Sequence, residues 1–256
     1  MKDVANKILF ISLSNIGDAV MTTTVLQALH ELYPEAVIDI VGDQRSSEIF
    51  EHCPYRGKIL HKQKNRFLRG VPALIIDLWA ESYDLIIDLR TDGLAYLLPA
   101  GKRYTKLNRI QTGTHSVQQQ LGIISKIYQG DPPQCHVWTS SIEKKFAEES
   151  LGEHYGKNLL GLGTGANAEK KIWSKENYLS LVEKAGNDFD AVIFLGDNRD
   201  KKHSNYISSR TDVPCINLCG KTSILEAVAI LQSLEFFVGN DSGLGHLASA
   251  AGIPTL

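Results

Sequence analysis

Short, almost wholly apolar runs alternate with longer amphipathic segments, and this alternation constrains the fold more than any other feature of the sequence. The runs 7–13, 37–41 and 84–89 predict buried strands, and the segments 18–33 and 71–82 predict helices between them. Strands that are apolar on both sides need cover on both faces, which a parallel sheet flanked by helices provides. The sequence therefore predicts an α/β fold built on parallel sheets.

The same alternation begins again after the turn-forming segment 130–133, which predicts a second α/β domain. We expect an N-terminal domain at 1–150 and a C-terminal domain at 151–256. Ser174 is placed to cap one later helix, and Ser223 with Glu226 forms a capping box for another. The later strands are predicted at 159–162, 191–195, 213–218 and 236–238, and the later helices at 142–151, 175–185, 223–233 and 244–251.

Composition and charge exclude several classes of protein. The formal net charge of −2 gives no global field that would attract nucleic acid. Of the four cysteines only Cys215 and Cys219 are close in sequence, and no further zinc ligands stand at suitable spacing, so we expect reduced thiols in a cytosolic protein. The N-terminus lacks a signal-peptide pattern and no apolar run is long enough to span a bilayer. Any membrane contact is therefore expected to be peripheral.

One local run of charge departs from the near-neutral average. No acidic residue lies between Glu51 and Asp77. Such a run favours binding to phosphates or to an anionic membrane surface, and the alternative is an ordinary solvated loop. Its basic residues are Arg56, Lys58, Lys62, Lys64, Arg66 and Arg69.

Ligands of open α/β sheets bind at the carboxyl ends of the strands, so the loops that follow the predicted strands are the candidate sites. In the first loop, at 14–18, Gly17 is expected to allow a tight turn and Asp18 to open the next helix. Asp18 has two interpretations. It is either a capping carboxylate at the helix N-terminus or a base that takes a proton from a hydroxyl.

The second loop, at 161–167, resembles half of a dinucleotide-binding fingerprint. It lacks the third glycine, and the next helix is predicted to begin only near Ser174, which disfavours an NAD-dependent oxidoreductase. Lys170, Lys171 and Trp173 follow. A lysine there is a candidate phosphate contact, and the alternative is a surface lysine beside a tryptophan that anchors the packing.

The third loop, at 239–246, follows a predicted strand and opens a helix. Its glycines and serine leave backbone amides free at a helix N-terminus, which favours an anion site. Asp241 and His246 flank this site and are candidates to hold sugar or ribose hydroxyls. The alternative is that Asp241 or Ser242 only caps the helix.

Five segments, taken in order, resemble glycosyltransferase family 9, the heptosyltransferases of lipopolysaccharide core assembly. The resemblance runs from about Lys7 to the last residue. The segments are ILFISLSNIGDAV at 8–20, YDLIIDL at 83–89, KIW at 171–173, LCGKTS at 218–223 and VGNDSGLGHLASAAGIPT at 238–255.

The resemblance implies a GT-B architecture, in which two Rossmann-like parallel-sheet domains face each other across a cleft. The N-terminal domain would hold a lipid-linked anionic saccharide, the lipid A–Kdo core, at the inner face of the inner membrane. The C-terminal domain would hold a nucleotide sugar, with ADP-heptose expected, and no metal or other cofactor is expected. The resemblance implies that Asp18 is the general base for an inverting displacement. It implies that the donor phosphates are bound by Lys171, Ser242 and Gly243, and that the donor sugar is bound by Asp241 and His246. The implied nucleotide-binding residues are Gly163, Thr164, Gly196 and Asp200.

The chain departs from the family pattern at three places. The segment 22–24 is Thr-Thr-Thr where a proline is usual, and Asp200 stands where a glutamate is expected. The third departure is the ending, because 254–256 resembles the start of another strand. We therefore expect a second domain that is incomplete at its C-terminus, with the edge of strand 236–238 unpaired and prone to self-association.

Three other functions compete with heptosyl transfer. One is a transferase of the same family that uses another nucleotide sugar for O-antigen or capsule. Another is a non-catalytic nucleotide-binding remnant, and the last is the NAD-dependent oxidoreductase considered above.

Overall fold

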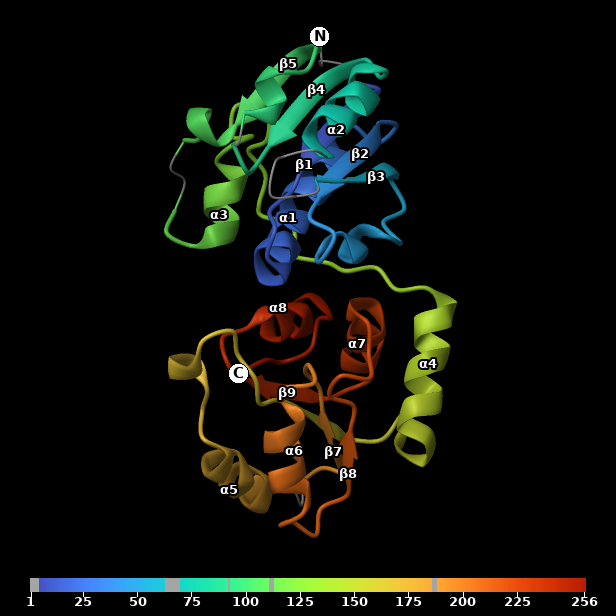
Figure 1. Cartoon of the computed structure of the whole chain (residues 1–256), viewed down its shortest axis with the longest axis vertical. Helices are drawn as coiled ribbons and strands as arrows, with labels where there is room; N and C mark the ends of the chain where they lie inside the picture. The colour runs from blue at the N-terminus through green and yellow to red at the C-terminus, as the bar shows by residue number, and fades with distance from the viewer. Residues whose placement is uncertain (1–4, 63–69, 92, 111–112, 186–187) are drawn as a thin grey trace. The chain divides into compact units, whose positions relative to one another are not determined.

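The computed structural model describes residues 5–62, 70–91, 93–110, 113–185 and 188–256, and the chain forms two compact units, 1–136 and 137–256 (Figure 1). The division lies between His136 and Val137, earlier than the expected boundary at 150. The reason is that helix α4 (Ser141–Leu151) packs against α7 (Ile224–Leu231), which belongs to the second unit.

The N-terminal unit is built on a five-stranded sheet with the strand order β3-β2-β1-β4-β5, in which every pairing is parallel. This sheet confirms the α/β prediction for the first half of the chain. Its elements are β1 Lys7–Ile11, α1 Ile16–Leu32, β2 Val37–Gly42, η1 Ser47–Phe50, β3 Arg56–His61, α2 Gly70–Trp79, β4 Tyr83–Asp88, η2 Leu94–Tyr96, β5 Ala100–Thr105, η3 Lys106–Asn108 and α3 Ser116–Leu121.

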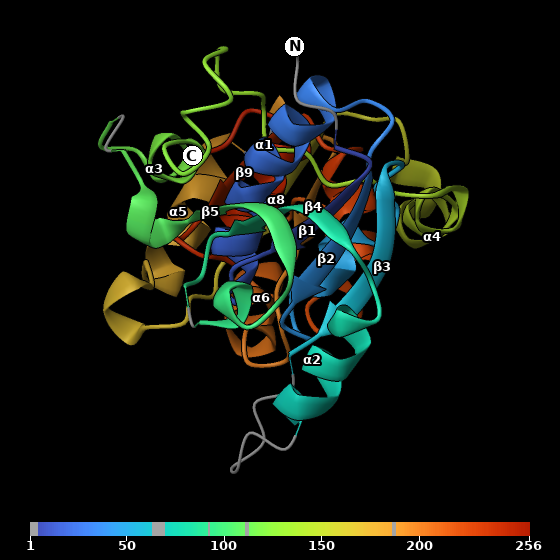
Figure 2. The ribbon, with the colours of Figure 1, turned by 90° about the horizontal axis from the view of Figure 1, so that it is seen from above.

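Helices cover both faces of this sheet, as its apolar strands require. Leu9 and Ile11 of β1 pack in one core cluster with Leu74 and Leu78 of α2. Successive side chains of a strand point to opposite faces, so the buried Phe10 lies on the other side. Helices α1 and α2 accordingly lie on opposite sides of the sheet (Figure 2).

The C-terminal unit is built on a four-stranded parallel sheet with the order β8-β7-β6-β9. Tyr178, Val182 and Ile207, from α5 and α6, share a core cluster with Leu162 and Phe194 of the sheet. The remaining elements are η4 Gly152–His154, β6 Leu159–Gly163, η5 Glu169–Lys171, α5 Lys175–Ala185, β7 Ala191–Phe194, α6 Lys201–Ser208, β8 Cys215–Asn217, β9 Phe236–Gly239 and α8 Gly243–Ala250.

Local hydrogen bonds that the sequence predicted are present at the ends of helices in this unit. The Ser223 side chain accepts from the Glu226 amide and the Glu226 carboxylate accepts from the Ser223 amide, which confirms the capping box. The Ser174 hydroxyl accepts from the Asn177 amide at 3.2 Å. Gly252 follows α8 with φ of 84°, in the left-handed region that favours glycine.

The expectation of an unpaired edge beside β9 is wrong. Thr255 forms a parallel bridge with Phe237, and the Leu256 amide donates to the Phe237 carbonyl at 2.9 Å. The Gly239 amide in turn donates to the Leu256 carbonyl at 2.9 Å. The residues after α8 therefore pair with β9 and satisfy its backbone groups on that side.

Candidate functional site

The loops that follow the strands of the C-terminal unit are held together at the carboxyl edge of its sheet. The Gly220 amide donates to the Gly196 carbonyl at 2.8 Å, which joins the loops after β8 and β7. The Asp200 carboxylate lies so close to Gly165 and Gly196 that a Cβ at either position would collide with it. A side chain at either glycine would force the Asp200 carboxylate to move, and Gly196 also has φ of 154°, a conformation that favours glycine.

Asp200 has a structural role that its sequence position did not reveal. It precedes α6, but its side chain does not cap that helix. Its carboxylate instead accepts from the Asp197 amide at 2.8 Å, and burial raises the pKa of Asp200. Asp200 thus braces the loop beside Gly165 and Gly196, and a contact with a nucleotide stays a prediction for it.

Gly163 and Thr164, at the end of β6, offer the next polar groups along this edge. The Gly163 carbonyl accepts from the Tyr178 hydroxyl at 3.1 Å and from the Asn240 amide at 3.3 Å. Within the described residues, the buried Thr164 hydroxyl has no hydrogen-bond partner. A buried hydroxyl in this condition is a candidate to bond a ligand. The following α-helix begins only at Lys175, which is too late for the helix N-terminus to hold a pyrophosphate as in a dinucleotide-binding turn.

Asn240 is a residue whose role the sequence did not indicate. Its side chain is buried and joins three loops, since its amide nitrogen donates to the Gly165 carbonyl at 3.3 Å and its oxygen accepts from the Trp173 amide at 2.9 Å. Its own backbone amide donates to Gly163. Asn240 therefore fixes the segment that carries Lys171 against the loop after β9.

We expect Asn240→Ala to lower the free energy of unfolding by about 1–3 kcal/mol, because two backbone groups lose a buried partner. Urea denaturation followed by circular dichroism measures the change. Asn177→Ala, at an exposed position of α5, is the matched control and should stay within about 0.5 kcal/mol of the wild type. Equal stability of Asn240→Ala and the control would show that this bridge contributes nothing.

Lys171 and Asp241, predicted separately as phosphate and sugar contacts, form an ion pair. The Lys171 Nζ lies 2.6 Å from Asp241 Oδ2, and both side chains remain largely exposed. This contact lowers the pKa of Asp241, with a smaller contribution from the charge of His246. The nearby Trp173 ring packs edge-on against Tyr178 with centroids 4.9 Å apart, although 44% of Trp173 remains exposed.

The N-terminus of α8 has the features that the sequence predicted for an anion site, and binding of an anion there stays a prediction. Ser242 is the N-cap residue, but its side chain makes no capping hydrogen bond, and Asp241 bonds Lys171. The first amides of the helix, beginning at Gly243, have no partner within the helix. The structure thus gives Ser242 the N-cap position without a side-chain capping bond, and its contact with a phosphate stays a prediction. The structure brings a cation, a helix N-terminus, Asp241 and His246 together within one unit.

Asp18 belongs to the N-terminal unit and lies in the first turn of α1. The N-cap residue is Asn15, so Asp18 is not the cap, and its Oδ2 accepts from the Asn15 Nδ2 at 3.0 Å. The carboxylate is half-buried. Gly17 lies inside the helix without a positive φ, so the expectation that it makes the tight turn is wrong. A role for Asp18 as a base stays a prediction.

The run of three threonines that replaces the usual proline is accommodated by hydrogen bonds. Thr22 and Thr23 donate to the carbonyls of Ala19 and Val20, three residues earlier in α1. The Thr23 hydroxyl also accepts from the His136 amide at 3.0 Å. These buried hydroxyls tie α1 to the end of the N-terminal unit.

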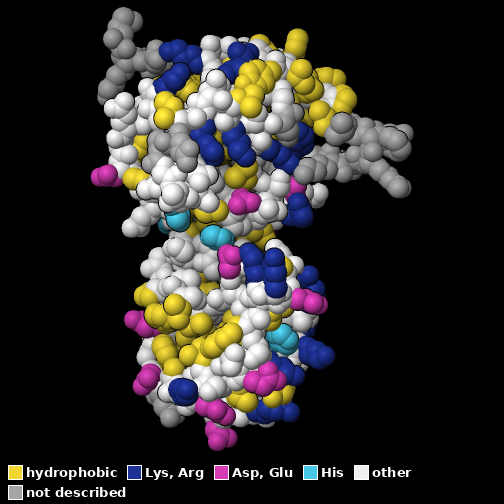
Figure 3. Space-filling model, turned by 90° about the vertical axis from the view of Figure 1, so that its left-hand side faces the viewer, with side chains coloured by type: hydrophobic (Ala, Val, Ile, Leu, Met, Phe, Trp, Pro, Cys, Tyr) yellow, Lys and Arg dark blue, Asp and Glu magenta, His cyan; other side chains and the backbone are white. Residues whose placement is uncertain are grey.

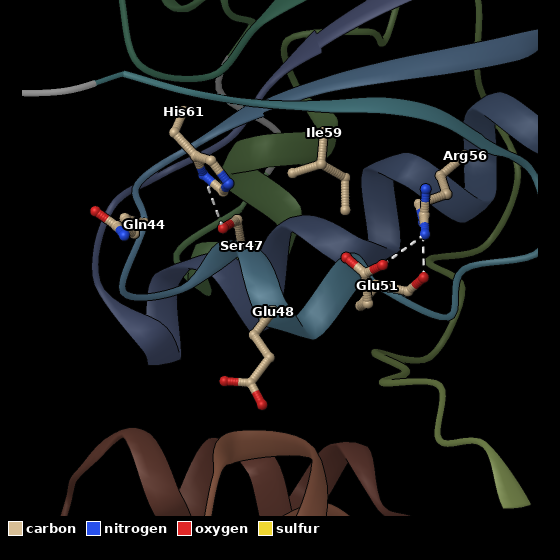
Figure 4. Close-up of a pocket in the computed structure, with 7 residues that line it drawn as sticks. All are labelled: Gln44, Ser47, Glu48, Glu51, Arg56, Ile59 and His61. Atoms are coloured by element: carbon tan, nitrogen blue, oxygen red, sulfur yellow. Dashed lines mark hydrogen bonds and ion pairs between the residues drawn. The ribbon is translucent and has the colours of Figure 1, made fainter. Parts of the chain in front are cut away.

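A cavity of about 410 Å³ lies in the N-terminal unit between η1 and β3 (Figure 4). The Ser47 hydroxyl and His61 Nδ1 are 3.1 Å apart in its wall, and an Arg56 nitrogen lies 2.7 Å from the Glu51 carboxylate. The cavity is lined by Gln44, Ser47, Glu48, Glu51, Arg56, Ile59 and His61.

Two residues of the predicted basic run, Arg56 and Lys58, lie in a strand and form ion pairs. Arg56 and Lys58 lie in β3, so the interpretation as a solvated loop is wrong for them. Arg56 bonds Glu51, and the Lys58 Nζ lies 2.6 Å from Glu81. These partners were not visible in the run itself because both carboxylates lie outside it. Lys62 directly follows β3, and the other basic residues Lys64, Arg66 and Arg69 lie outside the described residues.

The described cysteines are buried or partly buried thiols. Burial raises the pKa of Cys53, Cys215 and Cys219 to about 11, so these thiols stay protonated at neutral pH. In the part of the chain that the structure describes, no three His, Cys, Asp or Glu side chains gather so as to hold a metal ion. None of the described helices is both long and apolar enough to cross a bilayer.

Comparison with known proteins connects this arrangement to one family. Residues 99–256 match the model of glycosyltransferase family 9 (heptosyltransferase). The lipooligosaccharide heptosyltransferase 2 of Haemophilus ducreyi is 25% identical over 288 residues, which cover 97% of this chain and 81% of the relative.

Solved structures show the same fold. The family 9 glycosyltransferase of Veillonella parvula matches with a TM-score of 0.90 and 19% identity, over 100% of this chain and 80% of that one. The Escherichia coli heptosyltransferase WaaC, solved with ADP-2-deoxy-2-fluoro heptose, matches with a TM-score of 0.77 and 18% identity, over 97% of this chain and 87% of that one. These likenesses confirm the GT-B fold class.

Proposed function

The chain belongs to glycosyltransferase family 9, and from this we propose that it transfers heptose from ADP-heptose to the inner core of lipopolysaccharide. The observation that carries the proposal is the meeting of Lys171 with the N-terminus of α8 at the carboxyl edge of the C-terminal sheet. The similarity to lipooligosaccharide and lipopolysaccharide heptosyltransferases supports the choice of donor and acceptor.

The C-terminal unit holds the donor in this proposal. A departing diphosphate develops negative charge, and oriented amides and cations stabilise that charge. Lys171 and the amides at Ser242 and Gly243 have this chemistry. Asp241 and His246 hold the sugar, because a carboxylate and an imidazole can both form hydrogen bonds with sugar hydroxyls. The nucleotide lies against the loops that contain Gly163, Thr164, Gly196 and Asp200.

The N-terminal unit holds the acceptor and the base. A sugar hydroxyl is a weak nucleophile, and a positioned carboxylate helps by taking its proton as the new bond forms. Asp18 is the group for this task, and in-line displacement of the diphosphate inverts the anomeric centre. Because Lys171 and the helix amides meet the charge of the leaving group, the proposed reaction uses no metal ion. With a lipid-linked acceptor, the protein would act in the cytoplasm at the inner face of the inner membrane.

A calorimetric panel of ADP, ADP-heptose, UDP-sugars, GDP-sugars and NAD tests the donor assignment. We expect ADP and ADP-heptose to bind and to raise the unfolding midpoint in proportion to their saturation. Tighter binding of a UDP- or GDP-sugar would assign another nucleotide sugar to the same site. Binding of NAD without binding of ADP-heptose would overturn the proposal.

A further inference from the structure

Large hydrophobic side chains gather on the outer surface of the N-terminal unit. Five of them are 52–72% exposed and come from α2, η2, η3 and the residue after η2. Together they are called the apolar patch, which consists of Ile76, Trp79, Tyr96, Leu97 and Leu107. Isolated exposed hydrophobic residues are ordinary, whereas a contiguous group marks an interaction surface.

Hydrogen bonds connect the elements that carry this patch. The Trp79 indole nitrogen donates to the Leu97 carbonyl at 2.8 Å, which fixes the exposed ring of α2 beside η2. The Tyr96 hydroxyl lies 2.9 Å from the hydroxyl of Thr105, two residues before Leu107. These contacts place α2 beside η2 and the end of β5 beside η2, and the Trp79 ring stays exposed while its polar atom is hydrogen-bonded.

Helix α2 is apolar on both its inner and its outer side. Leu74 and Leu78 pack into the core of the sheet, while Ile76 and Trp79 remain exposed. Packing within the N-terminal unit explains why the inner side of α2 is apolar, but it does not explain the exposed apolar residues on the outer side. A helix with a second apolar face that its own unit does not cover is suited to an apolar partner.

The charge around the patch is basic. The stretch from Gly93 to Gly130 contains no Asp or Glu, and its exposed cations include Lys102, Lys106 and Arg109. On the α2 side, Asp77 is exposed, whereas Glu81 is ion-paired with Lys58. Figure 3 shows hydrophobic side chains of this unit next to a group of Lys and Arg side chains.

We propose that the apolar patch and its flanking cations bind the surface of an anionic phospholipid bilayer. An aromatic ring with a satisfied polar atom suits the boundary between headgroups and acyl chains, and nearby lysines are attracted to anionic headgroups. The cations favour a bilayer over a second copy of the chain, whose patch would carry the same charge. The inference rests on the proposed function in one respect, that a lipid-linked acceptor is met at a bilayer.

Flotation of the full chain with vesicles tests the inference. We expect binding to vesicles of phosphatidylethanolamine and phosphatidylglycerol and little binding to phosphatidylcholine alone. The double variant Ile76→Ser/Leu97→Ser should lower binding by about tenfold or more, since two apolar contacts are lost. Ile142→Ser is the matched control, because Ile142 is 75% exposed on α4 of the other unit. It should bind like the wild type.

A charge variant separates the electrostatic from the apolar part. Lys106→Gln should lower vesicle binding by about fivefold at low salt, and the difference should shrink as salt is added. Two results would overturn the inference: wild-type binding that is absent, or binding that is unchanged in the double variant. Sedimentation shows whether the chain self-associates. If the wild type self-associates, the double variant does not, and neither binds vesicles, the patch is assigned to a second copy of the chain.

Donor binding is measured on the same variants, so that the two proposals are judged separately. The patch and the donor site lie in different units, and we expect the affinity for ADP to be unchanged by Ile76→Ser/Leu97→Ser. Vesicle binding without ADP binding would refute the proposed function and leave the patch assigned. ADP binding without vesicle binding would support the proposed function and refute the assignment of the patch to a bilayer.

Discussion

Replacing Asp18 with Asn is expected to lower the turnover number by about 10²–10⁴-fold, the usual contribution of a positioned general base. The amide cannot take the proton of the acceptor hydroxyl. It keeps an oxygen that can accept from the Asn15 side chain, which bonds the carboxylate at 3.0 Å in the native protein. The fold and the donor site of the other unit should therefore be preserved.

Three measurements on Asp18→Asn separate catalysis from folding. The unfolding midpoint and the dissociation constant for ADP should match the wild type, while the turnover number falls. Glu35→Gln removes one carboxylate from an exposed position shortly after α1 and serves as the control. Turnover of Asp18→Asn within a few-fold of the control would remove Asp18 from the mechanism.

Replacing Lys171 with Met is expected to raise the dissociation constant for ADP by about 10–100-fold, because a charge-assisted hydrogen bond to the diphosphate is lost. In the unliganded protein Lys171 is already oriented by Asp241 at 2.6 Å. Little reorganisation is then needed when the diphosphate arrives. Isothermal titration calorimetry at several salt concentrations measures the effect, which should weaken as salt screens the charges.

Lys170→Met is the matched control for this experiment. Lys170 is the exposed neighbour in the same 3₁₀ turn, and the same substitution there should change the affinity for ADP by no more than a few-fold. Equal losses in the two variants would mean that general positive charge, and not the placement of Lys171, attracts the nucleotide.

The fold could be predicted wherever strands are apolar on both sides. The central strands β1 and β4 and the pair β6 and β7 consist of such runs, and the structure places each where the sequence indicated. The strands β3 and β5 were missed because they lie at the two edges of the sheet and contain polar residues, RGKILH and AGKRYT. Edge strands are solvated on one side, so their sequence shows no continuous apolar run.

The sequence names candidate donor-binding residues one by one, but it does not indicate which of them contact each other. The pairing of Lys171 with Asp241 joins positions 70 residues apart, and no local pattern indicates which polar groups meet across loops. Asn240 illustrates the same limit, because a buried side-chain amide that bridges backbone groups has no periodicity in sequence. The carboxyl edge of a parallel sheet is nevertheless a strong guide, since it brought the loops after β6, β7, β8 and β9 together.

Direct observation of the transfer reaction tests the central claim. The wild-type chain is incubated with ADP-heptose and an inner-core lipopolysaccharide acceptor, and product, ADP and anomeric configuration are followed by mass spectrometry and nuclear magnetic resonance. We expect one heptose added for each ADP released, with inversion at the anomeric carbon and loss of product in Asp18→Asn. Absence of transfer from ADP-heptose under conditions where ADP binds, or transfer with retention, would contradict the central claim.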